Sequence, residues 1–474
     1  MKRKKKLKDK SILAVTYMVL AVFAALMAYL LYYVLVLAPD VINNPYNKRQ
    51  SVLEKRIERG SILSADGSVL ACTLYDEDGN SYRYYPYANM FSHIVGYTYK
   101  GGYGLESYAG YYMLNSNQNL FEQLLNDLSQ KKSPGDDVVT TFDAALQKKA
   151  YDALGKNNGA VIISEPSTGK ILAMVSKPDF DPNTLAERWD RYVSQNESVL
   201  VNRALQGLYT PGSTFKIITL LEYVRENPLN YMDYKFTCTG SCTIDNTDIH
   251  CLLETAHGEE NLLYSLANSC NTSFVNIGLS LNIPKFNELC NRMLFNSNLP
   301  IDLEYNKSSF TLAEDAGSFT VAQTSFGQGA TVMTPIHMSL IMNAVANDGV
   351  VMKPMFLEQI VSSDGNVVKS FRSEAYTSIM TKEEADLLKD YLAQVAVIRY
   401  AWIFDGAEYT VSGKTGTAEH GGSEYSHSLF VSFAPSDVPE ISVVVVLEGD
   451  ENQDNTAVQV AKDIYDFYFS RNSN

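Results

Sequence analysis

A serine and a lysine three positions apart could supply a nucleophile and the base that activates it. The segment LYTPGSTFKIITLLEYV contains Ser213 and Lys216 at this spacing. The preceding Thr-Pro-Gly favours entry into a helix, and helical character continues to about Val224. Because residues three apart share one helix face, the hydroxyl and the amine would meet at the first turn. Burial lowers the pKa of a lysine, so Lys216 could accept the serine proton while the helix N-terminus favours the developing anion.

The spacing alone does not select Ser213. Ser129–Lys132 in SQKK and Ser167–Lys170 in STGK have it too, the first in a polar linker and the second in a predicted hairpin turn. Apolar side chains surround the helix after Ser213 in nearly every direction, which is typical of a buried helix. This context, together with two further motifs, favours Ser213 as the nucleophile.

A second polar motif, Ser269 and Asn271 in SLANSCNTSFVNIG, follows along the chain. Ser194-Gln195-Asn196 has the same Ser-x-Asn pattern, so this motif is also weak by itself. The Ser269 copy lies in an apolar helical stretch, where a buried hydroxyl and carboxamide need hydrogen-bond partners. By composition alone, a polar helix end is an equally good interpretation.

The third motif is Lys414-Thr415-Gly416-Thr417, which contains the only Lys-Thr-Gly in the chain. It follows the strand-like YTVSG and precedes two further strand candidates. Glycines at 413 and 416 would let a substrate backbone approach an edge strand closely. The lysine and the hydroxyls could hold a substrate carboxylate. Taken alone, Lys-Thr-Gly is equally consistent with a tight turn.

The elements that must position these residues predict an α+β fold. A strand and a helix capped near Asp143 precede GAVIISEPSTGKILAMVS, a predicted hairpin from Gly159. Three more strands, YTVSGKTGTAE, SLFVSFAP and ISVVVVLEG, lie near the C-terminus, and an amphipathic helix closes the chain. Residues 211–349 between the two groups are mainly helical and loop in character. We therefore predict an antiparallel sheet from both chain ends, flanked by helices, with a helical insertion and a cleft where the parts meet.

The N-terminal region predicts a membrane anchor. Residues 12–37 carry no charge and exceed the ~20 residues that span a bilayer. They are also too long for the apolar region of a cleaved signal peptide, usually ~7–15 residues. The basic run MKRKKKLKDK places residues 1–11 in the cytoplasm by the positive-inside rule. We expect a single-pass cell-membrane protein with an extracytoplasmic catalytic domain.

The rest of the chain is predicted to form two parts. Residues 38–140 are polar and tyrosine-rich, with turn signals, and we expect a short pedestal module there. The run KKSPGDD at 131–137 is a break of charges, proline and glycine. Residues 141–474 would form the catalytic domain.

Charge and cysteine content exclude or weaken other functions. The net charge is −15, and beyond the first ten residues 32 basic side chains face 53 acidic ones, which disfavours nucleic-acid binding. Cys238, Cys242 and Cys251 cluster near His250 and His257. Their spacing fits no standard zinc-finger pattern, so we expect a disulfide within this cluster rather than a metal. No metal or cofactor is therefore predicted.

The three motifs, in this order and context, match the set of penicillin-recognising acyl-serine enzymes. The chain resembles a class B penicillin-binding protein, a peptidoglycan D,D-transpeptidase, of the short penicillin-binding protein A-like subgroup. Further segments carry the resemblance: RGSILSADGSVLA (59–71), GLESY (104–108), TTFDAALQ (140–147), EPSTGKILAMVSKPDFDPN (165–183) and GQGATVMTPIHM (327–338). It therefore covers nearly the whole chain after the anchor.

The resemblance implies a role for each motif. Ser213 would attack the penultimate D-Ala carbonyl of a stem peptide, with Lys216 as general base. Ser269 would relay the proton to the leaving amine, and Asn271 would bind the donor peptide amide.

For the third motif, the resemblance implies that Lys414, Thr415 and Thr417 hold the terminal carboxylate. The backbone N–H groups of Ser213 and Thr417 would form the oxyanion hole, a device worth about 3 kcal/mol per donor. Gly416 completes the substrate-binding motif.

The resemblance also implies partners and leaves alternatives. The substrates would be peptidoglycan stem peptides and their lipid-linked precursor, β-lactams would inhibit, and a membrane glycan polymerase would supply the glycan. A DD-carboxypeptidase and a non-catalytic β-lactam sensor or scaffold remain the alternatives.

Three departures from the family pattern stand out. Ser64-Ala65 replaces an Asp-Arg pair, the segment VAVIRYAWIFDGAEYTVSG lacks a usual Gly-Thr pair, and Leu429 stands where Trp is frequent. The last two are expected at the cleft rim, where they would affect acceptor choice or β-lactam affinity.

Overall fold

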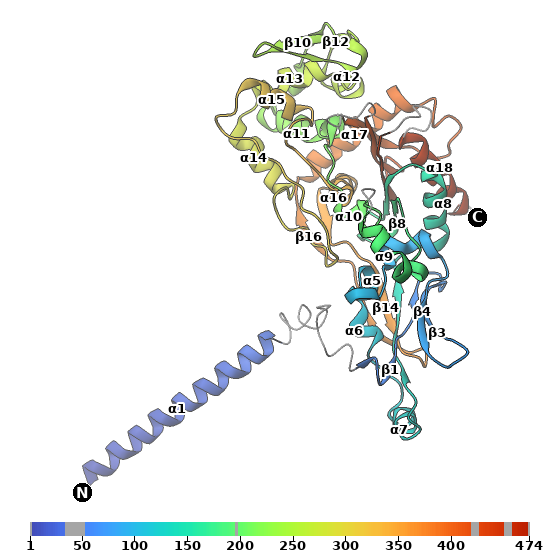
Figure 1. The fold of residues 1–474 in the computed structure, drawn as a ribbon. Coiled ribbons are helices and arrows are strands. Elements are labelled where there is room, and N and C mark those ends of the chain that lie inside the picture. Colours follow the sequence, from blue (N-terminus) through green and yellow to red (C-terminus); the bar gives the residue numbers. More distant parts are fainter. Residues whose placement is uncertain (1, 34–52, 195–197, 419–425, 450–456, 473–474) are drawn as a thin grey trace.

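The chain begins with a long, isolated helix. The computed structural model describes residues 2–33, 53–194, 198–418, 426–449 and 457–472 (Figure 1). Helix α1 (Lys2–Tyr32) includes a 21-residue apolar stretch, Ile12–Tyr32, none of which is buried inside the structure. An apolar helix of this length can cross a bilayer. The predicted span is thus helical in its described part, and its end, residues 34–37, lies outside the described residues.

A five-stranded antiparallel sheet forms the centre of the larger part of the molecule. Its strand order is β17-β18-β19-β7-β8, so neighbouring strands come from both ends of the chain, as predicted. Every side chain of β19, ISVVVVL, is buried, which suits a β-branched run in a sheet covered on both faces. The strands are β7 (Gly159–Ser164), β8 (Ile171–Lys177), β17 (Ser412–Ala418), β18 (His427–Ala434) and β19 (Ile441–Leu447).

Helices cover both faces of this sheet (Figure 1). Ser442 of β19 donates a hydrogen bond to Asn343 of α16, whereas Ser432 of β18 lies 2.9 Å from the hydroxyl of Tyr465 in α18. Ser442 pairs with Phe433, the neighbour of Ser432, so the two serines point to opposite faces. The covering helices are α8 (Ala144–Leu154) and α18 (Ala457–Asn472) on one face and α16 (Pro335–Ala346) on the other.

Helix α8 starts where the sequence predicts. The side chain of Asp143 accepts a hydrogen bond from the amide of Leu146 at 2.9 Å, which is an N-cap. The cap leads the chain from the N-terminal part onto the central sheet, against which α8 packs.

The N-terminal part contains its own six-stranded sheet, in the order β15-β14-β6-β2-β3-β4. Two of these strands come from late in the chain, because β14 returns to pair with β6. The division of the chain at residue 140 stays a prediction, and this pairing adds residues 357–370 to the N-terminal sheet. The strands are β2 (Ile62–Leu63), β3 (Val69–Tyr75), β4 (Ser81–Tyr84), β6 (Asp137–Thr140), β14 (Leu357–Val361) and β15 (Val367–Ser370).

Short helices accompany the N-terminal sheet, and further helices complete the other part of the molecule. Two minor sheets pair β1 (Ile57–Glu58) with β5 (Ser133–Pro134) and β13 (Val350–Met352) with β16 (Ala375–Ser378). The additional helices are α4 (Ser92–Val95), α5 (Gly104–Tyr108), α6 (Gly110–Met113), α7 (Leu120–Leu128), α9 (Leu185–Ser194), α10 (Arg203–Gln206) and α17 (Lys382–Tyr400).

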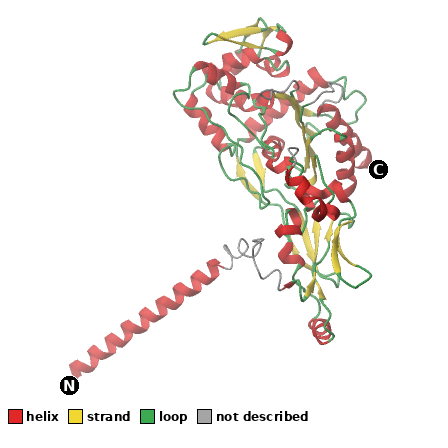
Figure 2. Ribbon diagram, in the orientation of Figure 1, coloured by secondary structure: helices red, strands yellow, loops and turns green. Residues whose placement is uncertain are grey.

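The insertion between the two strand groups is helical, as expected, but carries a small lobe of strands. Residues 236–260, here called the cysteine lobe, form two two-stranded sheets at the end of the molecule far from the N-terminal sheet (Figure 2). Its strands are β9 (Phe236–Cys238), β10 (Ser241–Ile244), β11 (Thr247–His250) and β12 (Gly258–Glu260). The helices are α11 (Lys216–Glu226), α12 (Leu262–Ala267), α13 (Asn271–Ser280), α14 (Ile283–Arg292) and α15 (Ser318–Ser325).

The prediction of a disulfide among the clustered cysteines is wrong. All six cysteines of the chain lie in described residues and are free. Sγ of Cys238 and Sγ of Cys251 are 3.7 Å apart, whereas a disulfide bond measures about 2.05 Å. Cys242 does not join these two, and Cys270 takes its place.

Candidate active site

Ser213 lies in a tight turn that leads into α11. The 3-10 turn η5 (Gly212–Thr214) precedes the α-helix, which begins at Lys216 rather than at Ser213 as the sequence suggests. The junction of this turn with the helix therefore sets how the hydroxyl of Ser213 approaches the amine of Lys216. Ser213 is half-buried and Lys216 is fully buried.

A glycine contact fixes this turn from the other side. Gly212 has φ +52°, a left-handed conformation that suits glycine, and its amide donates to the carbonyl of Gly327 at 2.9 Å. A Cβ on Gly327 would lie 2.0 Å from the Gly212 carbonyl oxygen, so only glycine allows this approach. The turn that carries Ser213 is therefore held by backbone contacts.

Lys216 joins the first two motifs. Its Nζ lies 3.0 Å from Oγ of Ser213, 2.6 Å from the carbonyl oxygen of Ser269 and 2.7 Å from Oδ1 of Asn271. Oγ of Ser269 is 3.2 Å away. A neutral amine has two N–H donors and one lone pair. The two shortest contacts use both donors, which leaves the lone pair for the proton of Ser213.

The environment favours this neutral form. Complete burial lowers the pKa of Lys216 from its ordinary value to about 7. A base with a pKa near 7 is partly neutral at physiological pH and is well matched to general-base catalysis. The site therefore contains an amine able to take a proton from Ser213.

Ser269 lies in a turn between two helices, not inside a helix as the sequence suggested. It follows α12 and has φ +54°, an uncommon conformation for a residue other than glycine. Cys270 then caps α13, where its Sγ accepts a hydrogen bond from the amide of Ser273. Asn271 begins α13, and its Nδ2 donates to the carbonyl of His250 at 2.8 Å. This turn brings Ser269 and Asn271 against Lys216.

Lys414 of the third motif reaches the same point from the sheet. Its buried Nζ lies 3.1 Å from Oγ of Ser269 and 3.0 Å from the carbonyl of Thr415. Burial, followed by the repulsion of Lys216 and Arg399, lowers the pKa of Lys414 well below its ordinary value. Ser269 thus lies between two lysines that both resist protonation.

Gly416 allows the third motif to lie beside the turn that carries Ser213. A Cβ at this position would come within 2.9 Å of the carbonyl oxygen of Pro211 and of Cγ2 of Thr214. Gly413 is confined by the rings and side chains of the next strand, where a Cβ would lie 2.7 Å from Cζ of Phe430. Close packing of the protein itself, rather than approach of a substrate alone, requires these glycines.

Thr415 is held by a residue that sequence reasoning missed. Oγ1 of Thr415 lies 2.8 Å from the hydroxyl of Tyr400, which also accepts the amide hydrogen of Thr415 at 3.1 Å. Tyr400 is the last residue of α17, inside the segment singled out for lacking a Gly-Thr pair. An aromatic residue close before a Lys-Thr-Gly motif could have suggested such a contact.

A cleft of about 700 Å³ opens over these residues. Six of the eight predicted site residues line it: Ser213, Ser269, Asn271, Thr415, Gly416 and Thr417. Lys216 and Lys414 lie behind its wall, with no exposed surface. Arg399 and the exposed Trp402 also line it and were not predicted. Leu429, expected at the rim, is fully buried on β18, where it pairs with Gly416 of β17.

A second cleft, of about 860 Å³, lies elsewhere, beside the N-terminal sheet. Tyr108, Asp302 and Lys353 are among its lining residues, and none of the predicted site residues lines it. The predicted site residues therefore converge on the smaller cleft, where Ser213, the two buried amines and the third motif meet.

The chain matches known proteins along most of its length. Residues 159–466 match the penicillin binding protein transpeptidase domain, and residues 59–138 match the penicillin binding protein A dimerisation domain. The peptidoglycan D,D-transpeptidase PbpA of Mycolicibacterium smegmatis is 30% identical over 435 residues, which cover 85% of this chain and 87% of that protein.

Solved structures share the fold. Penicillin-binding protein A of M. tuberculosis, in an imipenem acyl-enzyme complex, superposes with a TM-score of 0.81 at 24% identity, covering 88% of this chain and 99% of that one. The D,D-transpeptidase domain of an Eggerthella lenta peptidoglycan glycosyltransferase gives a TM-score of 0.77 at 28% identity, with coverage of 88% and 99%. The chain belongs to the penicillin-binding protein transpeptidase family, and the predicted family and α+β fold are confirmed.

Proposed function

We propose that this chain is a peptidoglycan D,D-transpeptidase that acts through an acyl-enzyme on Ser213. The observation that carries the proposal is the position of Lys216, whose buried Nζ lies 3.0 Å from Oγ of Ser213 and contacts both residues of the second motif. Relatives such as the mycobacterial PbpA proteins are named as peptidoglycan D,D-transpeptidases, which supports this substrate class.

In the acylation step, Oγ of Ser213 attacks the carbonyl carbon of the penultimate D-Ala. Lys216 takes the hydroxyl proton, and the C–N bond to the terminal D-Ala breaks. Ser269 lies within hydrogen-bond distance of both lysines, so it can relay the proton to the leaving amine. Free D-Ala leaves, and the peptide remains as an ester on Ser213.

Substrate binding would use the two walls of the cleft. We assign the donor peptide amide to Asn271 and the terminal carboxylate to the third motif, whose Thr415 and Thr417 line the cleft. Lys414 lies behind Ser269, and a bound carboxylate would favour its charged form. The N–H groups of Ser213 and Thr417 are assigned to the oxyanion hole, where each donor contributes about 3 kcal/mol.

In the second step an amine from another stem peptide attacks the ester. The new amide bond forms, the Ser213 oxygen recovers a proton, and two stems are joined. Water in place of the amine would give a carboxypeptidase. The relatives' names favour transfer to an amine, and product analysis separates the two reactions.

We also propose an arrangement at the membrane. With α1 as the anchor, the basic N-terminus lies in the cytoplasm and the cleft outside. The N-terminal module, residues 38–140, would hold the catalytic domain, residues 141–474, away from the bilayer, and a membrane polymerase would supply glycan. Protease added to intact protoplasts should remove the catalytic domain, and full protection of that domain would contradict this orientation.

Covalent labelling tests the nucleophile. Full-length protein in detergent should become labelled by a fluorescent penicillin, and Ser213→Ala should abolish the label. Ser167→Ala is the matched control, because this exposed serine has the same spacing to a lysine. The control should label normally. Persistent labelling of Ser213→Ala would sink the assignment, and failure to label the wild type would argue for a different function.

A further inference from the structure

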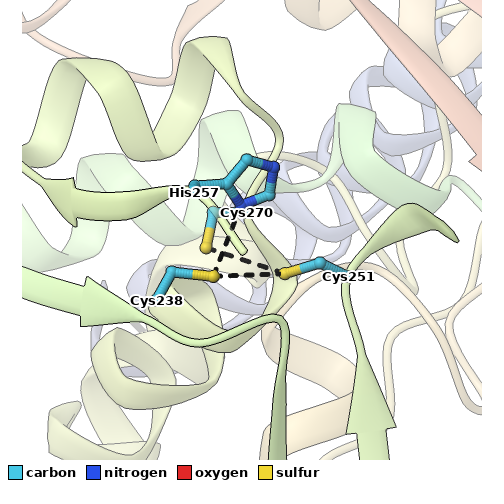
Figure 3. Close-up of side chains that lie close together, drawn as sticks. All are labelled: Cys238, Cys251, His257 and Cys270. Carbon is cyan, nitrogen blue, oxygen red and sulfur yellow. Dashed lines mark hydrogen bonds between the residues drawn. The ribbon is translucent and has the colours of Figure 1, made fainter. Parts of the chain in front are cut away.

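Three cysteines and a histidine converge beside the cleft. The four ligand atoms, Sγ of Cys238, Cys251 and Cys270 and Nδ1 of His257, lie within 4.8 Å of one another (Figure 3). Cys251 lies 3.7 Å from Cys238 and 3.8 Å from Cys270, measured between Sγ atoms. Nδ1 of His257 lies 3.4 Å from Sγ of Cys238.

Three of the six separations match the edges of a tetrahedron of ligands around one ion, and all six lie within 4.8 Å. A Zn–S distance of about 2.3 Å gives a tetrahedral S···S edge of about 3.8 Å, and a Zn–N distance of about 2.0–2.1 Å gives an S···N edge of about 3.6 Å. A disulfide would require about 2.05 Å between two sulfurs and would leave the third cysteine and the histidine unexplained. The geometry therefore fits shared coordination and not a bridge.

The surroundings of the sulfurs suit thiolates. The amide of Gly240 donates to Sγ of Cys238, and the amide of Ser273 donates to Sγ of Cys270, both at 3.4 Å. Hydrogen bonds from the protein to ligand atoms orient them and stabilise their charge. Gly240 has φ +96°, and a Cβ there would lie 2.4 Å from the carbonyl oxygen of Glu254. The turn after Cys238 is thus built so that a backbone amide faces the sulfur.

The cysteine lobe has little hydrophobic core of its own, although Ile249 packs into the main core of the domain. Of its 25 residues, Ile249 is the only aliphatic one whose side chain is buried. Its strands are three or four residues long, and more than half of their residues are exposed. Small segments without a hydrophobic core usually depend on a disulfide or a structural metal. Because the described cysteines form no disulfide, a structural metal would supply the cross-link that such a lobe commonly contains.

We propose that Cys238, Cys251, His257 and Cys270 bind one Zn²⁺ ion in a closed tetrahedral site. Three thiols each release a proton on binding, and the neutral imidazole ligates through Nδ1. Four protein ligands leave no open position, so the ion is structural and takes no part in the bond-making steps. This proposal replaces the expectation that the chain binds no metal.

The ion would also position the second motif. Cys270 stands between Ser269 and Asn271, so coordination fixes the turn in which Ser269 adopts φ +54°. Cys251 follows His250, whose carbonyl accepts from Nδ2 of Asn271 at 2.8 Å. Asn271 is therefore linked to the metal site twice. It directly follows the ligand Cys270, and its side chain bonds to the residue that precedes the ligand Cys251. This part of the inference rests on the proposed function, whereas the binding of zinc does not.

Metal content tests the site directly. Full-length protein is purified in detergent without chelators. Inductively coupled plasma mass spectrometry should then find about one zinc per chain. Cys238→Ser and His257→Ala should lose it. Cys242→Ser and His250→Ala are matched controls from the same lobe that lie outside the cluster, and they should keep it.

A second measurement covers variants that fail to fold. Wild-type protein stripped of metal should bind Co²⁺ with thiolate-to-cobalt charge-transfer bands and the visible bands of a tetrahedral site. Absence of zinc from the purified protein together with absence of these bands would overturn the proposal. So would alkylation showing Cys238 and Cys251 joined in a disulfide in protein purified without reductant.

Penicillin acylation tests the positioning role. Below its melting temperature, stripped protein should acylate about 100-fold more slowly, as expected when a reacting group moves by about 1 Å. Added Zn²⁺ should restore the rate, and the loss should fall on the acylation rate constant. Zinc-loaded protein that never acylates would contradict the proposed function and leave the metal site standing. An unchanged rate in stripped protein would overturn the positioning role.

Discussion

The two walls of the cleft are held in place by different interactions. The third motif lies on β17, the first strand of a sheet whose inner strand β19 is buried along its whole length. The second motif lies on a turn between α12 and α13, beside a cysteine lobe with one buried aliphatic side chain. One wall is fixed by apolar burial, and the other by a cluster of sulfur and nitrogen atoms.

This difference means that one side of the cleft is rigid, whereas the stability of the other side depends on ligand, oxidation state and pH. The sheet wall rests on the main core, so it is lost only when the domain unfolds. The other wall depends on local contacts that a ligand, oxidation or acid can change. Lys216 connects them, because its amine contacts Ser213 and the Ser269 turn, and Ser269 contacts Lys414.

Breaking the connection between the walls should have the largest effect. Lys216→Arg keeps a long cationic side chain but cannot supply a neutral base. Penicillin acylation should fall by about 10²–10⁴-fold, the range of general-base catalysis. Stopped-flow or gel-based rates measure it, with Lys170→Arg in the hairpin turn as the control. A loss of less than tenfold would mean that another group activates Ser213.

Removal of the metal should unfold the cysteine lobe locally and leave the central sheet folded. Chelation should raise amide hydrogen exchange in residues 236–260 by about 100-fold, the effect of losing a ligand present at 100 times its Kd. Exchange in β18 and β19 should not change. Hydrogen-exchange mass spectrometry of full-length protein makes the comparison. Equal changes in both walls would show that the lobe is not an independent unit.

The sheet wall can be displaced by one methyl group. Gly416→Ala should push β17 away from the nucleophile, because the added Cβ meets the Pro211 carbonyl and Thr214 at 2.9 Å. Acylation should fall by about 100-fold, as for a displacement of about 1 Å. Gly317→Ala is the control, since a methyl group there meets no atom closer than 4.0 Å. Normal acylation of Gly416→Ala would show that the strand tolerates the shift.

Lowering the pH should slow acylation of the wild-type protein, because it protonates Lys216. Burial lowers the pKa of Lys216 to about 7, so the neutral base forms as pH rises through 7 and is lost below it. Acylation should fall by about tenfold per pH unit below that value, since one proton is taken up. Rates from pH 5 to 9 measure this. A rate independent of pH over that range would contradict a neutral lysine base.

The smallest expected effect concerns support of the third motif. Tyr400→Phe removes the hydroxyl that contacts Thr415 while keeping the ring against Phe430. A single hydrogen bond contributes about 0.5–1.5 kcal/mol, so penicillin acylation should slow by about 2–10-fold. Tyr376→Phe, an exposed tyrosine, is the control. A loss as large as that of Lys216→Arg would give Tyr400 a part in the chemistry itself.

Local patterns predicted the elements that carry the site. The hairpin from Gly159, the cap at Asp143 and the strand of Lys414 all follow from periodicity and turn residues. The nearness of Ser213 and Lys216 followed from helical spacing alone. The 3-10 turn at Ser213 did not, because it depends on the approach of Gly327 from another part of the chain.

Contacts between residues far apart in the chain could not be predicted from the sequence. Cys270 joins Cys238 and Cys251 only because α13 begins beneath the cysteine lobe, and no spacing rule shows this. The pairing of β14 with β6 joins segments about 220 residues apart. Leu429 was placed at the rim, but its strand is the second of the sheet, so its side chain is buried. Each outcome depends on tertiary packing, which overrides local preference.

The central claim is transfer of a stem peptide from Ser213 to an amine. The direct measurement incubates full-length protein with lipid-linked peptidoglycan precursor and a matching polymerase, then determines products by mass spectrometry. The account predicts cross-linked dimers with release of D-Ala from the wild type, and neither product from Ser213→Ala. Release of D-Ala without dimers would identify a carboxypeptidase, and dimers from Ser213→Ala would contradict the account.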